Sequence, residues 1–132
     1  MEQTVVIIKP DGVKRKLVGK VIQRFEERGL IIKEMFQQTL EESLVKAHYA
    51  HLKDKPFFNE ILEYMTSGPV IVMILEQENV IQIVRKMIGT TNALEASPGT
   101  IRGDFALNAS ENIIHASDSL ESAEMEIRRF FS

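Results

Sequence analysis

The 132-residue sequence contains no cysteine. Disulfide bonds, thiolate nucleophiles and cysteine-based zinc or iron–sulfur centres are therefore excluded. The absence agrees with a reducing compartment, and the first residues, Met-Glu-Gln-Thr, show neither the basic segment nor the apolar stretch of a secretory signal. We therefore expect a cytoplasmic protein, and any nucleophile in it is not a thiol.

Long apolar runs and an excess of positive charge are also missing. The longest apolar runs, residues 5–8 and 70–75, are far shorter than the roughly 18 to 20 residues of a membrane span. The 16 basic and 19 acidic residues give a formal charge of −3, which supplies no long-range attraction to nucleic acid. We expect neither a membrane nor a nucleic-acid partner, so any anion site must be built locally.

Common signatures of nucleotide enzymes are absent as well: a Walker phosphate loop, a Gly-rich dinucleotide fingerprint and the protein-kinase motifs. Covalent chemistry is left to histidine, serine or a carboxylate, and the chain has only His48, His51 and His115. His48 and His51 share one face of a predicted helix and have no evident third ligand nearby. We expect them to be exposed and not to bind zinc.

The residues that are present suit one core, because 44% are hydrophobic and 27% are charged. We treat residues 1–132 as a single domain. Apolar and β-branched runs predict strands at residues 4–9, 30–40, 70–75 and 113–116. Helical spacing predicts helices at residues 17–28, 43–52, 57–65 and 80–88, and a last helix after residue 118.

The connections complete the predicted fold. Pro10 ends the first strand before an Asp11-Gly12 turn, and residues 89–103 read as a long functional loop. Asp118 and Glu121 match a capping box for the last helix. The apolar stripe of that helix is Leu120, Ala123, Ile127 and Phe130. The order predicts an α+β fold: a ferredoxin-like βαββαβ antiparallel sheet covered by helices, with an inserted helical hairpin and a long loop before the last strand.

His115 is the candidate nucleophile, because it ends a strand that leads into the last helix. A neutral imidazole attacks phosphorus and forms a phosphoramidate that can pass the group on. Three extended residues carry the chain about 10 Å outward to Asp118, and eight helical residues return it about 12 Å, to Glu126. Glu124 flanks the same apolar stripe, so only this length match favours Glu126. An isolated histidine at a strand end is more often structural.

Three basic residues are weak candidates for binding phosphate. Lys9 lies at the carboxyl end of the first strand, where open sheets often carry ligand groups. Arg102 lies in the predicted long loop, and a guanidinium suits bidentate phosphate contacts. Arg85 lies on the flank of its helix. Taken singly, each is explained equally well as a solvated side chain.

Six segments, in order along nearly the whole chain, resemble those of the nucleoside diphosphate kinases. They are Lys9-Pro10-Asp11-Gly12, His48-Tyr49, Pro56-Phe57-Phe58, Ser67-Gly68-Pro69, Pro98-Gly99-Thr100-Ile101-Arg102-Gly103-Asp104 and Asn112-Ile113-Ile114-His115-Ala116-Ser117-Asp118. The resemblance implies a ping-pong exchange. A nucleoside triphosphate such as ATP or GTP phosphorylates His115, and a diphosphate such as ADP collects the group.

The resemblance also implies roles for the matching residues. Phe57 would stack on the base opposite Ala109, although its local sequence suits a core residue as well as Phe58 does. Lys9 and Asn112 would hold the sugar hydroxyls, with Lys9 also near the transferred group. Phosphate would be bound by Arg85, Thr91 and Arg102, and Tyr49 would lie beside the histidine. Glu126 would bond to the ring nitrogen that does not attack, and Ser117 would support Glu126. Mg²⁺ is implied, held mainly by nucleotide phosphates and water.

The resemblance is less specific about the oligomeric state. Ala93 stands where many relatives have a proline, and Ser132 follows the last helix without the longer tail of many members. The resemblance implies a short, C-terminally truncated member that forms a homo-oligomer, at least a dimer, with tetramer and hexamer both open.

Two alternatives come from other functional classes. A ferredoxin-like regulatory module that binds a nucleotide without catalysis needs the phosphate ligands but not a paired His115 and Glu126. Single-stranded nucleic-acid binding on the sheet needs exposed aromatic residues interleaved with basic ones. The two tyrosines and seven phenylalanines are not arranged in that way.

Overall fold

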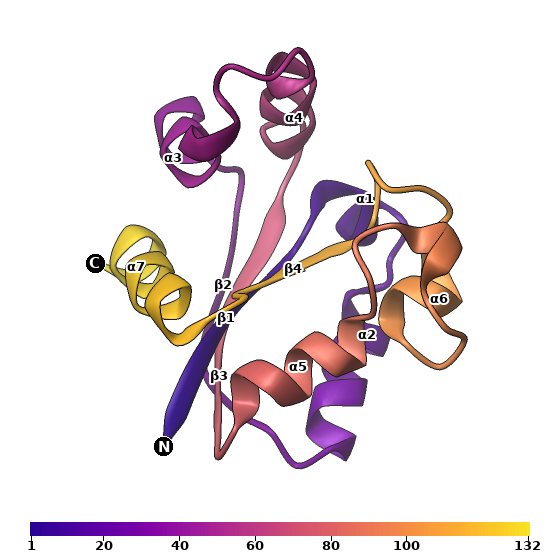
Figure 1. Cartoon of the computed structure of the whole chain (residues 1–132). Coiled ribbons are helices and arrows are strands. Elements are labelled where there is room, and N and C mark those ends of the chain that lie inside the picture. The colour runs from indigo at the N-terminus through magenta and orange to yellow at the C-terminus, as the bar shows by residue number, and fades with distance from the viewer.

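Four strands form one antiparallel sheet in the computed structural model, which describes residues 1–132 (Figure 1). The strands are β1 (Glu2–Ile8), β2 (Ile31–Gln38), β3 (Val70–Gln77) and β4 (Ile114–Ala116). Their order across the sheet is β2-β3-β1-β4, and every neighbouring pair is antiparallel. The predicted α+β, ferredoxin-like fold is confirmed, and each predicted strand is present within a few residues of its expected ends.

Helices cover both faces of this sheet. They are α1 (Pro10–Lys14), α2 (Val18–Glu27), α3 (Glu42–His48), α4 (Phe58–Met65), α5 (Val80–Ile88), α6 (Ile101–Phe105) and α7 (Leu120–Phe131), with short 3₁₀ turns η1 (Ala50–Leu52) and η2 (Ala93–Glu95). In Figure 1, α2, α5 and α6 lie on one side of the sheet, whereas α3, α4 and α7 lie on the other. None of the helices is long and apolar enough to cross a membrane.

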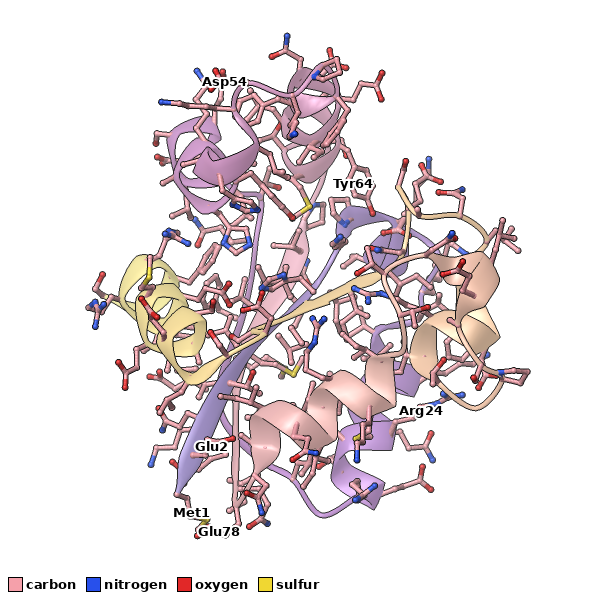
Figure 2. The ribbon with its side chains drawn as sticks, in the orientation of Figure 1. Met1, Glu2, Arg24, Asp54, Tyr64 and Glu78 are labelled. Carbon is pink, nitrogen blue, oxygen red and sulfur yellow. The ribbon has the colours of Figure 1, made fainter.

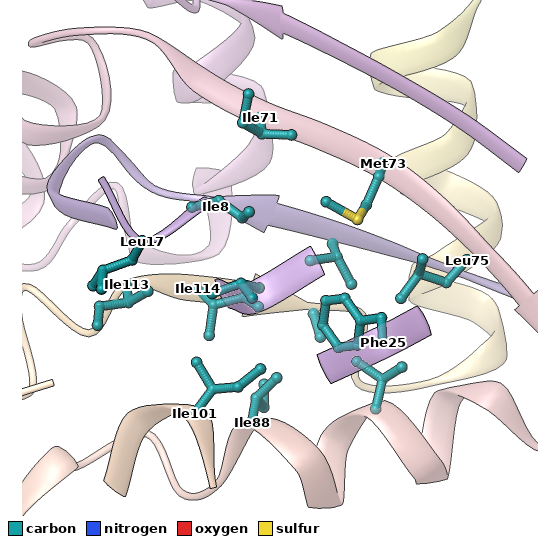
Figure 3. Close-up of a cluster of buried hydrophobic side chains, with 14 of the residues drawn as sticks. Ile8, Leu17, Phe25, Ile71, Met73, Leu75, Ile88, Ile101, Ile113 and Ile114 are labelled. Carbon is teal, nitrogen blue, oxygen red and sulfur yellow. The ribbon is translucent and has the colours of Figure 1, made fainter. Parts of the chain in front are cut away.

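Two cores result, because the central strand β1 is buried on both faces. Alternate residues of a strand point to opposite faces. Val6 and Ile8 therefore join one cluster, which contains Phe25 of α2 and Ile88 of α5 (Figure 3). Val5 and Ile7 join the second cluster, under α3, α4 and α7.

The same alternation orients the short edge strand β4. Ile114 and Ala116 are buried in the first core, so His115 between them points to the opposite face, toward α7. Ile7 is the register partner of His115 on β1 and belongs to the second core. The strand thus holds the histidine at the boundary between the sheet and α7.

Several local predictions are wrong. The predicted Asp11-Gly12 turn is the first turn of α1, because Pro10 has the backbone angle that suits the start of a helix. The predicted loop at residues 89–103 contains η2 and the start of α6, which Thr100 caps by accepting a hydrogen bond from the Gly103 N–H.

The start of the last helix also differs from the prediction. Its N-cap is Ser119, whose hydroxyl accepts from the backbone N–H of Ser122 at 3.0 Å, so the Asp118–Glu121 capping box is wrong by one residue. Leu120 is 56% exposed and does not belong to the apolar stripe. Ala123 and Phe130 are buried as predicted.

Candidate active site

His115, Glu126 and Ser117 form a hydrogen-bonded chain where β4 meets α7. The Nε2 atom of His115 lies 3.0 Å from Oε1 of Glu126, and the Ser117 hydroxyl donates to the same oxygen at 2.7 Å. The Ser117 Oγ in turn accepts from the backbone N–H of Val5 at 3.0 Å. Because Glu126 is bonded at Nε2, the Nδ1 atom of His115 has no protein partner and is the nitrogen free to react.

Glu126 is only 7% exposed and yet stays ionised. Burial by itself raises the pKa of a carboxyl group, but the hydrogen bonds from His115 and Ser117 and the charge of the imidazole outweigh it and lower the pKa of Glu126. A carboxylate held in this way fixes the imidazole of His115 as the Nε2–H tautomer. The contact is the one that the length of the chain predicted.

A cavity of about 510 Å³ opens beside His115 and is lined with basic side chains. Lys9, Arg85 and Arg102 line it from separate parts of the chain, and Thr91 and Asn112 line it as well. The side chains of four of these five residues, all but Thr91, are held in place by hydrogen bonds within the protein. The cavity concentrates positive charge that the net charge of −3 does not reveal.

Arg102 is the most deeply buried of these cations. It is 4% exposed, donates to the carbonyls of Gly89 at 3.0 Å and Ile114 at 2.6 Å, and has no partner for its buried Nε–H. Burial, followed by the nearby charge of Arg85, lowers its pKa to about 10, so it stays charged at neutral pH. Arg85 donates to the carbonyl of Ala116 at 3.2 Å. Both guanidinium groups are therefore held beside β4 with N–H groups to spare.

Lys9 and Asn112 are joined across the end of the sheet. The Lys9 ammonium donates to the Asn112 Oδ1 at 2.7 Å, and the Asn112 amide donates to the Thr91 carbonyl at 3.2 Å. Burial and then the positive charge of Arg102 lower the pKa of Lys9 to about 8, against a smaller opposing effect of Asp11. Lys9 has no ion-pair partner in the protein. An anion bound in the cavity would therefore stabilise the charged form of Lys9.

Tyr49 lies between the basic cavity and a second one. Burial, together with the charge of Glu126, raises the pKa of Tyr49 to about 12, so its hydroxyl is protonated and can donate a hydrogen bond.

The second cavity, of about 600 Å³, shares Lys9, Tyr49, Thr91 and Asn112 with the basic one. Phe57 and Ala109 line it, and Phe57 is 43% exposed at the start of α4. The local interpretation of Phe57 as a core residue is therefore wrong. A partly apolar cavity joined to a basic one suits a molecule with an aromatic ring at one end and phosphates at the other.

A strained residue holds this edge of the site together. Ile113 has φ +73°, a left-handed conformation that is costly for a β-branched side chain. Its N–H donates to Asp11 Oδ2 at 3.1 Å, and its carbonyl accepts from the Lys9 N–H at 2.7 Å. The Tyr64 hydroxyl, which reaches from α4 toward α1 in Figure 2, donates to the other oxygen of Asp11. These bonds keep Asn112 beside Lys9.

Comparisons with known proteins agree on one family. The family model described as nucleoside diphosphate kinase matches residues 2–132. The chain belongs to the nucleoside diphosphate kinase family. A nucleoside diphosphate kinase of Acetivibrio thermocellus is 55% identical over 131 residues, which cover 99% of this chain and 96% of that protein.

Solved structures of nucleoside diphosphate kinases share the fold. An apo enzyme from Encephalitozoon cuniculi matches with a TM-score of 0.97 and 44% identity, covering 99% of this chain and 89% of that one. A halophilic enzyme from Halobacterium salinarum, solved in complex with CDP, also has a TM-score of 0.97, with 41% identity over 99% of this chain and 88% of its own.

In this member of the nucleoside diphosphate kinase family, the prediction that His48 is exposed is wrong. His48 is 8% exposed, and its ring lies edge to face with that of His115, with 4.8 Å between their centroids. Its burial depends on packing against α7, and the sequence of α3 alone does not indicate that packing. His51, by contrast, is exposed as predicted.

Two further residues of the site were not predicted. Arg129, one turn after Glu126 on α7, lines the basic cavity and contacts His48. The spacing of three residues from Glu126 was the available signal. Asp118 lines the same cavity and accepts from the Ser122 hydroxyl at 2.7 Å, and this bond lowers its pKa.

Metal binding by protein ligands alone has little support in this site. Ligand atoms of His48, His115 and Glu126 lie within 4.8 Å of one another. However, the Glu126 oxygen already accepts two hydrogen bonds, and His48 Nδ1 faces a guanidinium N–H. Hydrogen bonding within the protein accounts for this cluster.

Proposed function

We propose that the protein transfers the terminal phosphoryl group of a nucleoside triphosphate to a nucleoside diphosphate through a phosphohistidine at His115. The observation that carries the proposal is the bond between His115 Nε2 and the Glu126 carboxylate, which leaves Nδ1 free beside a basic cavity. Membership of the nucleoside diphosphate kinase family supports the same reaction.

In the first half-reaction, Nδ1 of neutral His115 attacks the γ-phosphorus. The new N–P bond forms as the bond from phosphorus to the β,γ-bridging oxygen breaks, and the diphosphate leaves with that oxygen. Nε2 keeps its proton, so the ring becomes more positive as Nδ1 is phosphorylated. The Glu126 carboxylate, supported by Ser117, stabilises this charge. A second diphosphate then attacks the phosphohistidine by the reverse route.

The cationic residues position the phosphates and neutralise their charge. Arg85 and Arg102 have spare N–H groups at the wall beside β4, and Lys9 carries a positive charge with no carboxylate partner. We assign the transferred group to the neighbourhood of Lys9 and the Tyr49 hydroxyl, and the Thr91 side chain to a phosphate. Positioning and charge neutralisation are the main contributions of proteins to phosphoryl transfer.

The second cavity would take the nucleoside. Phe57 offers an exposed ring for the base to stack on, and the side chain of Ala109 in the same cavity has no donor or acceptor to read the edge of the base. Lys9 and Asn112, joined at 2.7 Å where the cavities meet, would bind the sugar hydroxyls. We therefore expect weak discrimination among ATP, GTP and other nucleotides.

Mg²⁺ fits this site only as a companion of the nucleotide. Two carboxylates line the basic cavity, and Glu126 is committed to His115 and Ser117. Asp118 is the remaining carboxylate within reach, so the phosphates and water would hold most of the ion, with Asp118 at its periphery. Bound in this way, Mg²⁺ would neutralise phosphate charge. A homo-oligomeric state and a cytoplasmic location stay predictions.

The kinetic pattern distinguishes this reaction from the alternative of a non-catalytic nucleotide-binding module. With ATP and dTDP varied together, a phosphoenzyme predicts parallel double-reciprocal lines. It also predicts exchange of label between ATP and ADP when no other nucleotide is present. A module that only binds would show affinity for ADP without exchange. Intersecting lines would indicate direct transfer between two bound nucleotides and would refute the phosphohistidine.

A further inference from the structure

Arg129 and His48 contact each other next to the reacting histidine. His48 ends α3, Arg129 lies in the last part of α7, and the Arg129 Nη1 atom is 3.1 Å from Nδ1 of His48. Arg129 takes part in no ion pair of the chain. The one hydrogen bond of its side chain is the one to the imidazole.

This contact settles the chemical form of His48. A guanidinium is permanently charged and has donors but no acceptor, so Nδ1 of His48 must accept, and the proton of the ring is on Nε2. A protonated His48 would lose this bond and bring two positive charges together. Burial first, and then His115, Arg129 and Lys9, lower the pKa of His48 to about 3, against the opposing effect of Glu126.

The form of His48 matters because two imidazoles adjoin one carboxylate. Ligand atoms of His48, His115 and Glu126 lie within 4.8 Å of one another, and the two rings are in edge-to-face contact. In the structure the Glu126 carboxylate is hydrogen-bonded to His115. A cationic or reoriented His48 would compete for that carboxylate and would move the ring that packs against the nucleophile.

We propose that Arg129 is a positioning residue for phosphoryl transfer: by donating to His48 Nδ1, it fixes the neutral His48 ring against His115 and leaves the Glu126 carboxylate to His115 alone. The inference rests on the proposed function of His115. It also accounts for an arginine that faces the cavity from α7, one turn beyond Glu126, without a carboxylate partner.

The titratable and charged groups that face His48 come from several elements around it. They are His115 on β4, Glu126 and Arg129 on α7, and Lys9 after β1. Removal of the Arg129 charge eliminates one repulsion and the only hydrogen bond that favours the neutral ring. The pKa of His48 therefore rises in Arg129→Leu, in the direction that lets His48 compete for Glu126.

The test compares Arg129→Leu with Arg128→Leu, an exposed arginine one residue earlier on the same helix. Loss of one charge-assisted hydrogen bond predicts a roughly tenfold fall in kcat with the affinity for ADP preserved. Arg129→Lys, whose ammonium can donate to the same nitrogen, should recover most of the rate. In ¹⁵N NMR spectra of the free protein, His48 should be the Nε2–H tautomer in the wild type and in Arg128→Leu. In Arg129→Leu alone, this tautomer preference should be lost and the titration of His48 should move to higher pH.

A His48→Asn background separates positioning from direct phosphate binding. If Arg129 acts through His48, Arg129→Leu has little further effect in that background. An equal loss in both backgrounds, or a rise in KM with kcat unchanged, would overturn the inference and make Arg129 a phosphate ligand. Wild-type rates in Arg129→Leu would also overturn it. Labelling of wild-type His115 by ATP is measured first, because its absence refutes the proposed function and not the role of Arg129.

Discussion

Glu126→Gln is the substitution that examines the chemistry most closely. Glutamine keeps the length of the side chain and an acceptor oxygen for His115, but it removes the negative charge 3.0 Å from Nε2. A hydrogen bond involving a charged group contributes about 1.5 to 3 kcal/mol, and this one strengthens as the ring becomes positive. We therefore expect kcat to fall roughly 10- to 150-fold.

The affinity for nucleotide should not change, because Glu126 is committed to His115 and Ser117 and not to a ligand. Rapid-quench measurement of phosphoenzyme formation gives the chemical step, and calorimetry with ADP gives the affinity. Glu124→Gln, an exposed neighbour on the same helix, is the matched control and should behave as wild type. A loss of ADP affinity equal to the loss of rate, or an unchanged rate of phosphorylation, would refute the role given to Glu126.

Three more predictions follow from single contacts. Lys9, whose pKa is about 8, should lose its proton in the free protein as the pH rises through that value. ADP binding should therefore weaken above pH 8 in the wild type but not in Lys9→Arg. Phe57→Ala should raise KM for every nucleotide by a similar factor, on the order of tenfold, and leave the thermal unfolding midpoint nearly unchanged, because the ring is 43% exposed; a base-specific effect would contradict stacking. Gly103→Ala would drive a Cβ into the Ser97 carbonyl oxygen and should cost about 1 to 3 kcal/mol of unfolding free energy along with activity. A Cβ added at Gly19, within α2, meets no atom within 4 Å beyond the adjoining helix backbone, so Gly19→Ala should be neutral or stabilising. Equal unfolding midpoints for these two variants would contradict the close approach at Gly103.

Residues whose environment is set within one or two adjacent elements were predicted best from the sequence. Glu126 followed from the lengths of an extended and a helical segment that fold back on each other, and the buried stripes of α2 and α5 followed from helical spacing. In these cases the period of the secondary structure alone decides which side chains meet.

The errors concern contacts between distant elements or very short helices. His48 looked exposed because its burial depends on α7, which begins only at Leu120 and packs against α3; its contact with Arg129 joins residues 81 apart in the sequence. The five-residue helices α1 and α6 are too short for a periodic pattern, and they are held by tertiary hydrogen bonds such as that of Ile113 N–H to Asp11. Phe57 resembled a core residue because composition does not distinguish a buried ring from one left exposed for a ligand.

The central claim, that His115 carries the phosphoryl group, is tested most directly by the chemistry of the labelled protein. After incubation with γ-³²P-ATP and Mg²⁺ and removal of nucleotide, we predict one label per chain that is stable in alkali and lost in acid, as a phosphohistidine requires. The label should map to the peptide that contains His115, persist in His51→Asn, and vanish in His115→Asn. Label that survives in His115→Asn, or an unlabelled wild-type protein that still binds ADP, would contradict the account.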